Sequence, residues 1–266
     1  MTGSGNDFVF VDGRNSAVRD FAAPETIRRL CARGTGVGAD GLVILTEPDS
    51  SSADIAIRYF NADGSVAALC GNATLCTTAL AVRLGAADGA GFRLGTGAGV
   101  VSARVCDALP EFDLPVIDDV HDAWPAIPAE TGEARLGFAR AGIPHFVIRV
   151  ADVDLVEVGR RGPNVRHHAS LPDGANVNFV SPDGRGGWKI RTYERGVEAE
   201  TLACGTGSVA SAILLRLWGE AGDDVRLRTA SGSVLRVKLQ RHAGGGWNAS
   251  LRGEGRLVFA GELVAA

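Results

Sequence analysis

The chain has 266 residues, which suits one large domain or two of about 130 residues each. Its formal net charge is −4 and it contains no block of like charge, so neither nucleic acid nor an anionic membrane is expected as the main partner. No apolar run approaches the roughly 18 residues that a membrane-spanning helix needs, although hydrophobic residues make up 45% of the chain.

The N-terminus, Met1–Asp7, lacks the basic and apolar regions of a signal peptide, so we expect a cytoplasmic protein. Five cysteines without C-x-x-C spacing favour neither a disulfide framework nor a structural zinc site. They are Cys31, Cys70, Cys76, Cys106 and Cys204. The 36 glycines exclude a helical bundle and indicate many turns between short strands.

In chain order, the first half predicts a short strand at residues 8–11, a helix at residues 24–31 with Pro24 in its first turn, and buried strands at residues 42–45 and 55–60. Asn61–Gly64 is typical of a tight turn. The loop Gly34–Gly38 lacks the G-x-G-x-x-G spacing and the preceding strand of a dinucleotide site. Residues 92–105 predict two strands bent at Gly99.

Two segments share an unusual pattern, in which a cysteine and a glycine precede a run of small and apolar residues. The runs are Ala73–Leu84 after Cys70 and Gly207–Trp218 after Cys204, and each is followed by glycine. Each predicts a helix that is apolar nearly all round and therefore buried on every side. A cysteine at such a helix N-terminus faces unpaired N–H groups and the positive dipole end, which lowers a thiol pKa from roughly 8.5 toward neutrality.

The second half repeats the order of the first at a nearly constant offset. The cysteines are 134 residues apart (204 − 70), and Val225–Val234 matches Phe92–Val101 at an offset of 133 with five identities in ten positions. Such a repeat indicates a duplicated unit. Residues 107–130, rich in Pro and Asp, are the expected crossover between the two copies.

We therefore expect an α+β fold with two pseudo-symmetric domains, each a strongly curved, mostly antiparallel sheet wrapped around its apolar helix. The expected domains are residues 1–114, which carry Cys70, and residues 115–252, which carry Cys204. A pseudo-two-fold axis would place both helix N-termini at the shared interface. A thiolate on one face of a substrate carbon could then remove a proton while a thiol on the other face returns one, which inverts a stereocentre without redox change.

Six motifs in family order resemble diaminopimelate epimerase. They are Gly5-Asn6-Asp7-Phe8, Gly38-Ala39-Asp40-Gly41, Phe60-Asn61-Ala62-Asp63-Gly64, Cys70-Gly71-Asn72, Gly174-Ala175-Asn176-Val177, and Glu194-Arg195-Gly196 with Ala203-Cys204-Gly205-Thr206-Gly207. The match runs from residue 3 to about residue 262. The resemblance implies interconversion of LL- and meso-diaminopimelate, on the route to lysine and peptidoglycan, without pyridoxal phosphate or a metal.

The same resemblance implies roles for individual residues. Cys70 and Cys204 are the expected acid/base pair, with His145 and Glu194 tuning their pKa values. The reacting amino-acid end is expected on Gly71, Asn72, Gly205 and Thr206, and the distal end on Asn6, Asn61, Asn176, Glu194 and Arg195. The resemblance also implies that a C-terminal strand, residues 253–266, returns to the first domain. The assembly state stays open, with a homodimer among the options.

The chain departs from the family pattern in five features. Ile143 stands where the family usually has asparagine, Ala73 and Leu75 replace a glycine and an arginine, and the Glu194–Cys204 spacing is one residue longer. Strand residues that normally precede Gly3 are absent, so we expect either a truncated start or a misassigned initiator. These changes concern substrate specificity more than the mechanism.

Three other functions are compatible with parts of the pattern. A proline or hydroxyproline racemase of the same fold is the nearest, although Asn72 with Arg195 disfavours it. A non-catalytic redox sensor would use Cys70 and Cys204 as a reversible disulfide. An isomerase that uses a carboxylate instead of thiols is disfavoured by the presence of both cysteines. His167-His168 is better read as a solvated loop than as a metal pair.

Overall fold

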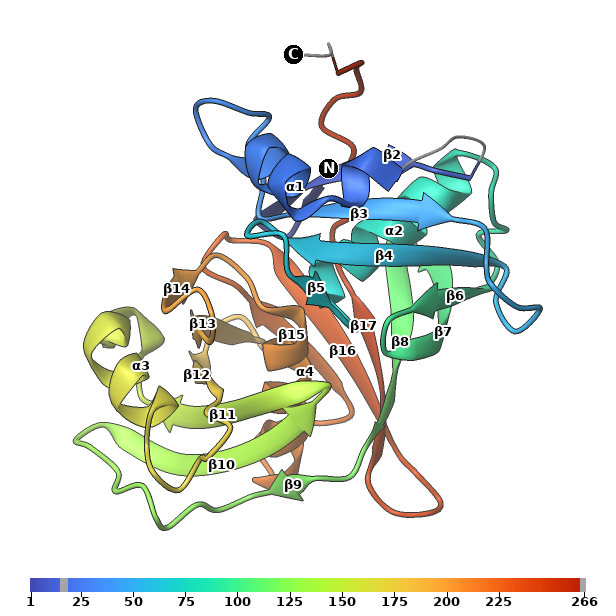
Figure 1. Cartoon of the computed structure of the whole chain (residues 1–266). Helices are drawn as coiled ribbons and strands as arrows, with labels where there is room; N and C mark the ends of the chain where they lie inside the picture. The colour runs from blue at the N-terminus through green and yellow to red at the C-terminus, as the bar shows by residue number, and fades with distance from the viewer. Residues whose placement is uncertain (15–18, 264–266) are drawn as a thin grey trace. The chain divides into compact units, whose positions relative to one another are not determined.

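A computed structural model of the chain describes residues 1–14 and 19–263. The chain divides into two compact units, shown as ribbons in Figure 1. Unit 1 comprises Met1–Glu111 and Glu254–Ala266, and unit 2 comprises Phe112–Gly253. Each unit has its own set of paired strands and its own central helix, and each is described separately below.

Unit 1 is built on a mixed, mostly antiparallel sheet. Its strands are β1 (Thr2–Gly3), β2 (Asn6–Asp12), β3 (Gly41–Thr46), β4 (Ile55–Asn61), β5 (Val66–Ala67), β6 (Phe92–Thr96) and β7 (Gly99–Cys106). β2 runs parallel to β3, and β4 parallel to β6. The pairs β1–β2, β3–β4, β4–β5 and β6–β7 are antiparallel. The helices are η1 (Arg19–Ala22), α1 (Pro24–Cys31) and α2 (Gly71–Arg83).

Unit 2 repeats this scheme with additional strands. Its strands are β9 (Val120–His121), β10 (Glu133–Ala141), β11 (Ile143–Val150), β12 (Asn176–Pro182), β13 (Trp188–Glu194), β14 (Ala199–Thr201), β15 (Asp224–Arg228), β16 (Val234–Arg241) and β17 (Trp247–Arg252). β11–β12 and β13–β15 are parallel, and the pairs β9–β10, β10–β11, β12–β13, β13–β14, β15–β16 and β16–β17 are antiparallel. Its helices are η2 (Val153–Leu155), α3 (Val158–Arg166) and α4 (Gly205–Leu217). β8 (Leu109–Ile117) spans the boundary between the units.

The strand registers of the two units correspond. Ile55 pairs with Leu94 in the parallel pair β4–β6, and Trp188 pairs with Leu227 in the parallel pair β13–β15, so both positions are displaced by 133 residues. In the hairpin that follows, Leu94 opposes Val101 whereas Leu227 opposes Leu235, because the second turn is one residue longer. The structural counterpart of Val101 is therefore Leu235, and the sequence alignment of Val101 with Val234 is wrong by one residue.

Each unit wraps its sheet around one buried helix. In unit 1, α2 contacts β1, β4 and β7, and in unit 2, α4 contacts β10, β11, β12, β16 and β17. Residues on all sides of both helices are buried, which confirms the mixed α+β fold with a central apolar helix that the sequence predicts. Thr77 and Thr78 sit in this apolar setting because their hydroxyls donate to carbonyls four residues earlier, at 2.8 Å each.

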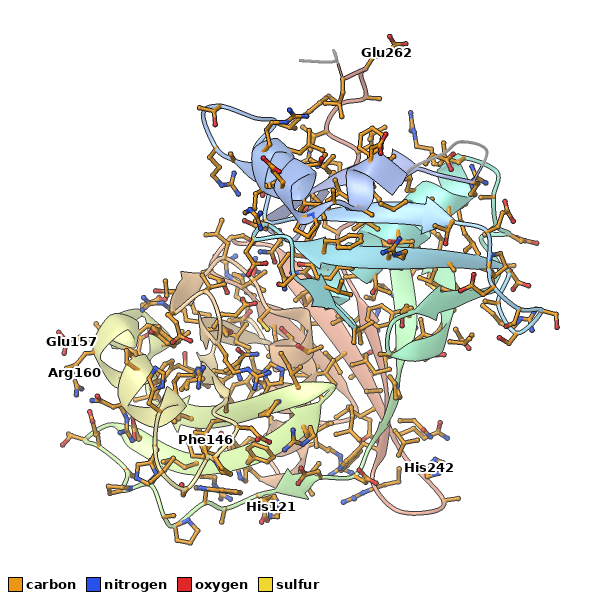
Figure 2. All side chains as sticks on the ribbon, in the orientation of Figure 1. His121, Phe146, Glu157, Arg160, His242 and Glu262 are labelled. Atoms are coloured by element: carbon orange, nitrogen blue, oxygen red, sulfur yellow. The ribbon has the colours of Figure 1, made fainter. Side chains whose placement is uncertain are left out.

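Large side chains fill the interior of each unit (Figure 2). The core of unit 1 includes Leu42, Ile44 and Phe60, and the core of unit 2 includes Phe146, Ile148 and Phe179, all 0–1% exposed. Phe146, which Figure 2 labels on β11, is one residue from His145. The core thus supports the strands whose ends carry the polar residues described below.

Three segments differ from the sequence prediction. Residues 107–130, expected only as the crossover between the two copies, contain the strands β8 and β9, which were not predicted from the sequence. The predicted C-terminal strand is a single antiparallel bridge between Arg256 and Thr2, and residues 264–266 lie outside the described part of the chain. Helix α3 was not predicted, because its sequence carries Pro163, two glycines and three arginines; it packs against β13, where Gly162 approaches the ring of Tyr193.

Candidate active site

Cys70 and Cys204 occupy equivalent positions, each at the N-cap of the central helix of its unit. The backbone of Cys70 is extended, with φ −130° and ψ 119°, and that of Cys204 is nearly the same, with φ −134° and ψ 110°. Neither N-cap side chain bonds to the first turn of its helix. The first-turn N–H groups therefore remain available to a ligand anion, and the helix dipole favours negative charge there.

The same local contacts hold both cysteines. The carbonyl oxygen of Cys70 accepts from the backbone N and from the hydroxyl of Thr74, each at 2.9 Å. The carbonyl of Cys204 accepts equally from the backbone N of Ser208 at 3.0 Å and from its hydroxyl at 2.9 Å. A hydroxyl residue four positions into the helix thus fixes the backbone that carries each sulfur. All five cysteines of the chain are present as thiols.

In unit 1 the candidate residues gather at one edge of the sheet, where β2 and β3 begin, β4 ends and α2 starts. Asn72 is 1% exposed and its Nδ2 donates to Asn6 Oδ1 at 2.6 Å. Asn6 Nδ2 donates in turn to Asp40 Oδ2 at 3.0 Å. The carboxylate of Asp40 only accepts, so the orientations of both amides follow from it. Gly71 is the first residue of α2.

Arg33 donates hydrogen bonds to the acidic residues of this network. Arg33 donates to both oxygens of Asp7, at 2.9 and 2.7 Å, and to Asp40 at 2.9 Å. Partial burial raises the pKa of Asp7, but the hydrogen bonds and charge of Arg33 outweigh it and hold that pKa below its usual value. Asp40 therefore presents a fixed acceptor to Asn6.

Asn61 lies at the same edge of unit 1, opposite Gly41 in the register. Its Nδ2 donates to Ser65 Oγ at 2.9 Å within the Asn61–Ser65 turn. Gly64 in this turn has φ +86°, which explains the glycine. The structure therefore brings Asn6, Asn61 and Asn72 to one edge, but only Asn6 and Asn72 are hydrogen-bonded to each other.

In unit 2 the equivalent edge holds a buried chain of hydrogen bonds that ends at Cys204. His145 Nε2 lies 3.0 Å from Thr206 Oγ1, and Thr206 Oγ1 lies 3.8 Å from Cys204 Sγ. His145 is 0% exposed. Its burial, with the charge of Arg195 as the second cause, lowers the pKa of His145 to about 3. The imidazole is therefore neutral at working pH and reaches Cys204 through Thr206 rather than directly.

Asn176 and Arg195 meet at the same edge of unit 2. Asn176 pairs with His145 in the register, and its Oδ1 accepts from the backbone N of Arg195 at 2.7 Å. The guanidinium of Arg195 donates to the carbonyl of Asp173 at 2.9 Å. Glu194, the last residue of β13, and Gly205, the first of α4, flank this group.

Two buried amide atoms near the cysteines have no hydrogen-bond partner among the described residues. They are Asn72 Oδ1, an acceptor, and Asn176 Nδ2, a donor. Buried polar groups are nearly always satisfied in native proteins. Unit 1 therefore offers an unpaired acceptor near Cys70, and unit 2 offers an unpaired donor near Cys204.

The departures from the family pattern also have places in the structure. Ile143 begins β11 at the position that corresponds to Asn6, because His145 and Phe8 hold equivalent registers. It is 37% exposed. The segment between Glu194 and Cys204 contains β14, which pairs with β13. Leu75 is 0% exposed in the core of unit 1, beside the chain at Gly255.

One polar residue of the site was missed by the sequence reasoning. Asn178 is 0% exposed on β12, two residues after Asn176 and therefore on the same face of the strand. Its Oδ1 would be only 2.2 Å from a Cβ at Gly207, so it lies against the first turn of α4. The alternation of two asparagines in an otherwise apolar buried strand was the available signal.

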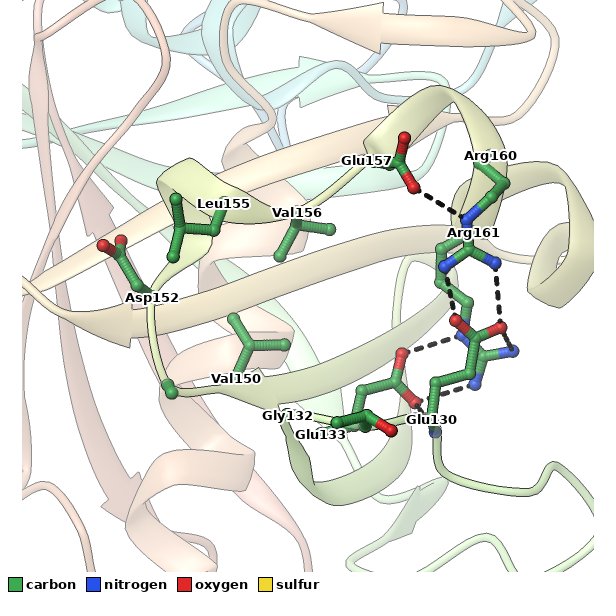
Figure 3. A pocket seen from close by; sticks show the side chains of 12 residues that line it. Glu130, Gly132, Glu133, Val150, Asp152, Leu155, Val156, Glu157, Arg160 and Arg161 are labelled. Atoms are coloured by element: carbon green, nitrogen blue, oxygen red, sulfur yellow. Dashed lines mark hydrogen bonds and ion pairs between the residues drawn. The ribbon is translucent and has the colours of Figure 1, made fainter.

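A pocket elsewhere in unit 2 does not include these residues. It has a volume of about 280 Å³ and lies between the start of β10, the end of β11 and α3 (Figure 3). Its arginines are paired with its own glutamates: Arg160 with Glu130 and Glu157, and Arg161 with Glu133. Asp152 also lines the pocket, and its carboxylate accepts from the backbone N of Asp154 at 3.0 Å.

Comparisons with known proteins decide the family. A family model described as diaminopimelate epimerase matches residues 1–114 and 137–254. The chain belongs to the diaminopimelate epimerase family. A diaminopimelate epimerase of Gemmatimonas aurantiaca is 50% identical over 99% of this chain and 98% of that relative. One from Aquifex aeolicus is 40% identical over 89% of this chain and 88% of its own.

Solved structures support the fold of a diaminopimelate epimerase at lower identity. A hydroxyproline epimerase from Agrobacterium vitis superposes with a TM-score of 0.66 at 20% identity, over 95% of this chain and 87% of that chain. A phenazine biosynthesis protein of the PhzF family from Bacillus anthracis gives a TM-score of 0.71 at 14% identity, over 95% and 91%. Among the described residues, no helix is both long and apolar enough to cross a bilayer.

Proposed function

We propose that this chain interconverts LL- and meso-diaminopimelate by proton transfer at one α-carbon, with Cys70 and Cys204 as the acid/base pair. The observation that carries the proposal is the matched placement of the two cysteines, each an extended N-cap on a buried helix of a duplicated unit. Relatives that are 50% and 40% identical carry the name of this activity. The reaction serves lysine and peptidoglycan precursor synthesis, which we place in the cytoplasm.

The proton balance of the reaction needs no external redox partner. One cysteine, as thiolate, takes the α-proton, and the electron pair of the broken C–H bond delocalises into the substrate carboxylate. The other cysteine, as thiol, gives its proton to the opposite face and becomes the thiolate. The configuration is inverted, and proton exchange with solvent restores the starting state. Thiols suit both roles because a thiol at a helix N-terminus can titrate near neutral pH, so that either member of the pair can start as the base.

The barrier lies in the carbanion, since an amino-acid α-proton is only weakly acidic. We assign its stabilisation to the N–H groups at Gly71-Asn72 and Gly205-Thr206, in the first turns of the two helices. A single preorganised donor of this kind contributes roughly 3 kcal/mol to transition-state stabilisation. Two helix ends, together with exclusion of water, then supply a large share of the rate enhancement.

The vacant amide atoms suggest how the substrate is oriented. Asn72 Oδ1, a buried acceptor, suits a substrate ammonium, and Asn176 Nδ2, a buried donor, suits a carboxylate. We assign the distal carboxylate to Arg195 with Asn176, because an arginine forms charge-assisted bonds to a carboxylate. Asn6, Asn61 and Glu194 complete the set that we propose for the distal end.

A substrate panel separates this proposal from its rivals. Purified enzyme without added cofactor is offered LL-diaminopimelate, L-proline and trans-4-hydroxy-L-proline, and the stereoisomers formed are separated by chiral chromatography. We expect turnover of LL-diaminopimelate at least about 100-fold faster than of the imino acids, because those lack the distal amino-acid end that Arg195 and Asn176 bind. Preferred turnover of an imino acid would contradict the assignment, and no turnover of any substrate by reduced enzyme would favour the redox-sensor reading.

A further inference from the structure

Asn178 holds a fixed orientation inside unit 2. Its Nδ2 lies 3.1 Å from the carbonyl oxygen of Phe146 and 3.3 Å from His145 Nδ1, and its Oδ1 lies 3.0 Å from Thr192 Oγ1. A carbonyl oxygen only accepts, so the amide nitrogen must face Phe146 and the hydroxyl of Thr192 must donate to Oδ1. The same amide nitrogen therefore donates to His145 Nδ1.

This orientation decides the tautomer of His145. A ring nitrogen that accepts a hydrogen bond carries no proton, so the single proton of the neutral imidazole is on Nε2. Nε2–H then donates to Thr206 Oγ1 at 3.0 Å. Because that oxygen already accepts, the hydroxyl proton of Thr206 is directed to another acceptor, and Cys204 Sγ lies at 3.8 Å.

We propose that Asn178 is a positioning residue, which holds His145 as the Nε2–H tautomer and so directs the Thr206 hydroxyl proton at the sulfur of Cys204. The proposal rests on the proposed function, in which Cys204 exchanges a proton with the substrate. A hydrogen bond donated to sulfur favours its thiolate form, so the chain from Asn178 to Thr206 helps Cys204 to act as base.

Two features of the fold fit this assignment. A Cβ at residue 207 would come within 2.2 Å of Asn178 Oδ1 and 3.2 Å of Cys204 Sγ, so Gly207 leaves the space that the amide occupies. The arrangement belongs to one unit, because the register equivalent of His145 in unit 1 is Phe8. The second copy of the duplicated frame therefore carries a hydrogen-bonding histidine at a position where the first copy has an apolar side chain.

The test begins with the tautomer itself. The intact wild-type enzyme is labelled with ¹⁵N at histidine, and the His145 ring signals are identified by their loss in His145→Gln. We expect a proton on Nε2 and an unprotonated Nδ1. A proton on Nδ1 in the wild type would overturn the proposal, and this measurement needs neither a variant of Asn178 nor activity.

The second part compares a variant that removes the whole amide with a variant that removes only its hydrogen bond from Thr192. In Asn178→Leu both donor bonds of the amide are lost and no charge enters the buried site, so nothing holds the proton of His145 on Nε2 and the hydroxyl of Thr206 is no longer directed at Cys204. Thr192→Val removes the bond to Oδ1 and leaves the amide nitrogen in place. It is the matched structural control.

We expect Asn178→Leu to lower kcat about 10-fold, which corresponds to the loss of one hydrogen bond to a charged group, and to move the pH midpoint of Cys204 alkylation upward. Thr192→Val should stay within about threefold of wild type in kcat, with an unchanged midpoint. Equal midpoints in the two variants would overturn the proposal. If the wild type lacks epimerase activity but the tautomer and the midpoint shift are found, the proposed function fails and the role of Asn178 stands.

Discussion

Asparagines give the cysteine-containing edges of unit 1 and unit 2 opposite hydrogen-bonding character. In unit 1, Asp40 orients Asn6, which orients Asn72, and an acceptor oxygen is left over. In unit 2, the backbone N of Arg195 occupies the oxygen of Asn176, and a donor nitrogen is left over. A substrate that carries both ammonium and carboxylate groups matches this pair of vacancies, as we propose for diaminopimelate.

Burial of His145 predicts a dependence of stability on pH. The pKa of His145 is lowered to about 3 by burial and then by the charge of Arg195, so the folded protein keeps this ring neutral. In the unfolded chain a histidine takes up a proton below about pH 6.5. The unfolded state then binds more protons, and the free energy of unfolding falls as the pH drops from 6.5 toward 3.

His145→Gln removes this proton uptake. Between pH 6.5 and 5, the free energy of unfolding of the variant should fall less steeply than that of the wild type, by up to about 1.4 kcal/mol per pH unit. Urea unfolding at half-unit pH steps measures both slopes. Above pH 7 the curves should run parallel, since neither state takes up a proton at this position there; equal slopes below pH 6.5 would contradict the burial of a neutral ring.

Site residues that belong to a local sequence motif could be predicted from the sequence. Site residues whose role depends on packing between strands were missed. Cys70, Cys204, Asn72 and Thr206 follow from the helix pattern and the resemblance, and all lie in the first turn or at the N-cap of α2 and α4. Asn178 was missed because its role depends on His145 from β11 and Thr192 from β13, neither of which is near it in sequence.

The central helices are stabilised by burial on every side rather than by one apolar face. In α4 the side chain of Leu214 is 0% exposed and would lie 2.9 Å from a Cβ at Gly137 of β10, so the helix and the sheet are in close contact there. Removal of such a side chain leaves a cavity, because close-packed surroundings relax only partly.

Leu214→Ala should therefore lower the free energy of unfolding by about 2–5 kcal/mol. The matched control is Leu155→Ala, because Leu155 is 82% exposed and its loss should change stability by no more than about 0.5 kcal/mol. Urea titration of both variants provides the comparison. If the two substitutions cost the same, α4 is not the buried centre of unit 2.

Elements with a strong local signal were predictable, and those formed by tertiary pairing were not. The predicted helix at residues 24–31 is α1, and the apolar runs after both cysteines are α2 and α4, which begin two residues earlier than the runs. β8 was missed because residues 107–117 contain two prolines and several acidic residues, which are rare in strand interiors. Helix α3 was missed because its helical propensity is low and its packing against Tyr193 compensates.

The whole molecule uses one frame twice with different residues at equivalent positions. By strand register, Phe8 of unit 1 corresponds to His145 of unit 2, and Asn6 corresponds to Ile143. The cysteines and the starts of their helices are alike in both units. The common part supplies one thiol and one helix N-terminus from each unit. The residues that differ between the units offer different chemical groups to the two ends of the substrate, as the proposed function requires.

The central claim is that both thiols exchange protons with one α-carbon, and heavy water tests it most directly. LL-diaminopimelate is incubated in D₂O with reduced wild-type enzyme, Cys70→Ser or Cys204→Ser, without added cofactor, and deuterium at the α-carbon and the meso isomer are measured by NMR and chiral chromatography. We expect the wild type to form α-deuterated meso product and each variant to lose at least about 100-fold in epimerisation. No exchange with the wild type, or undiminished epimerisation by either variant, would contradict the account.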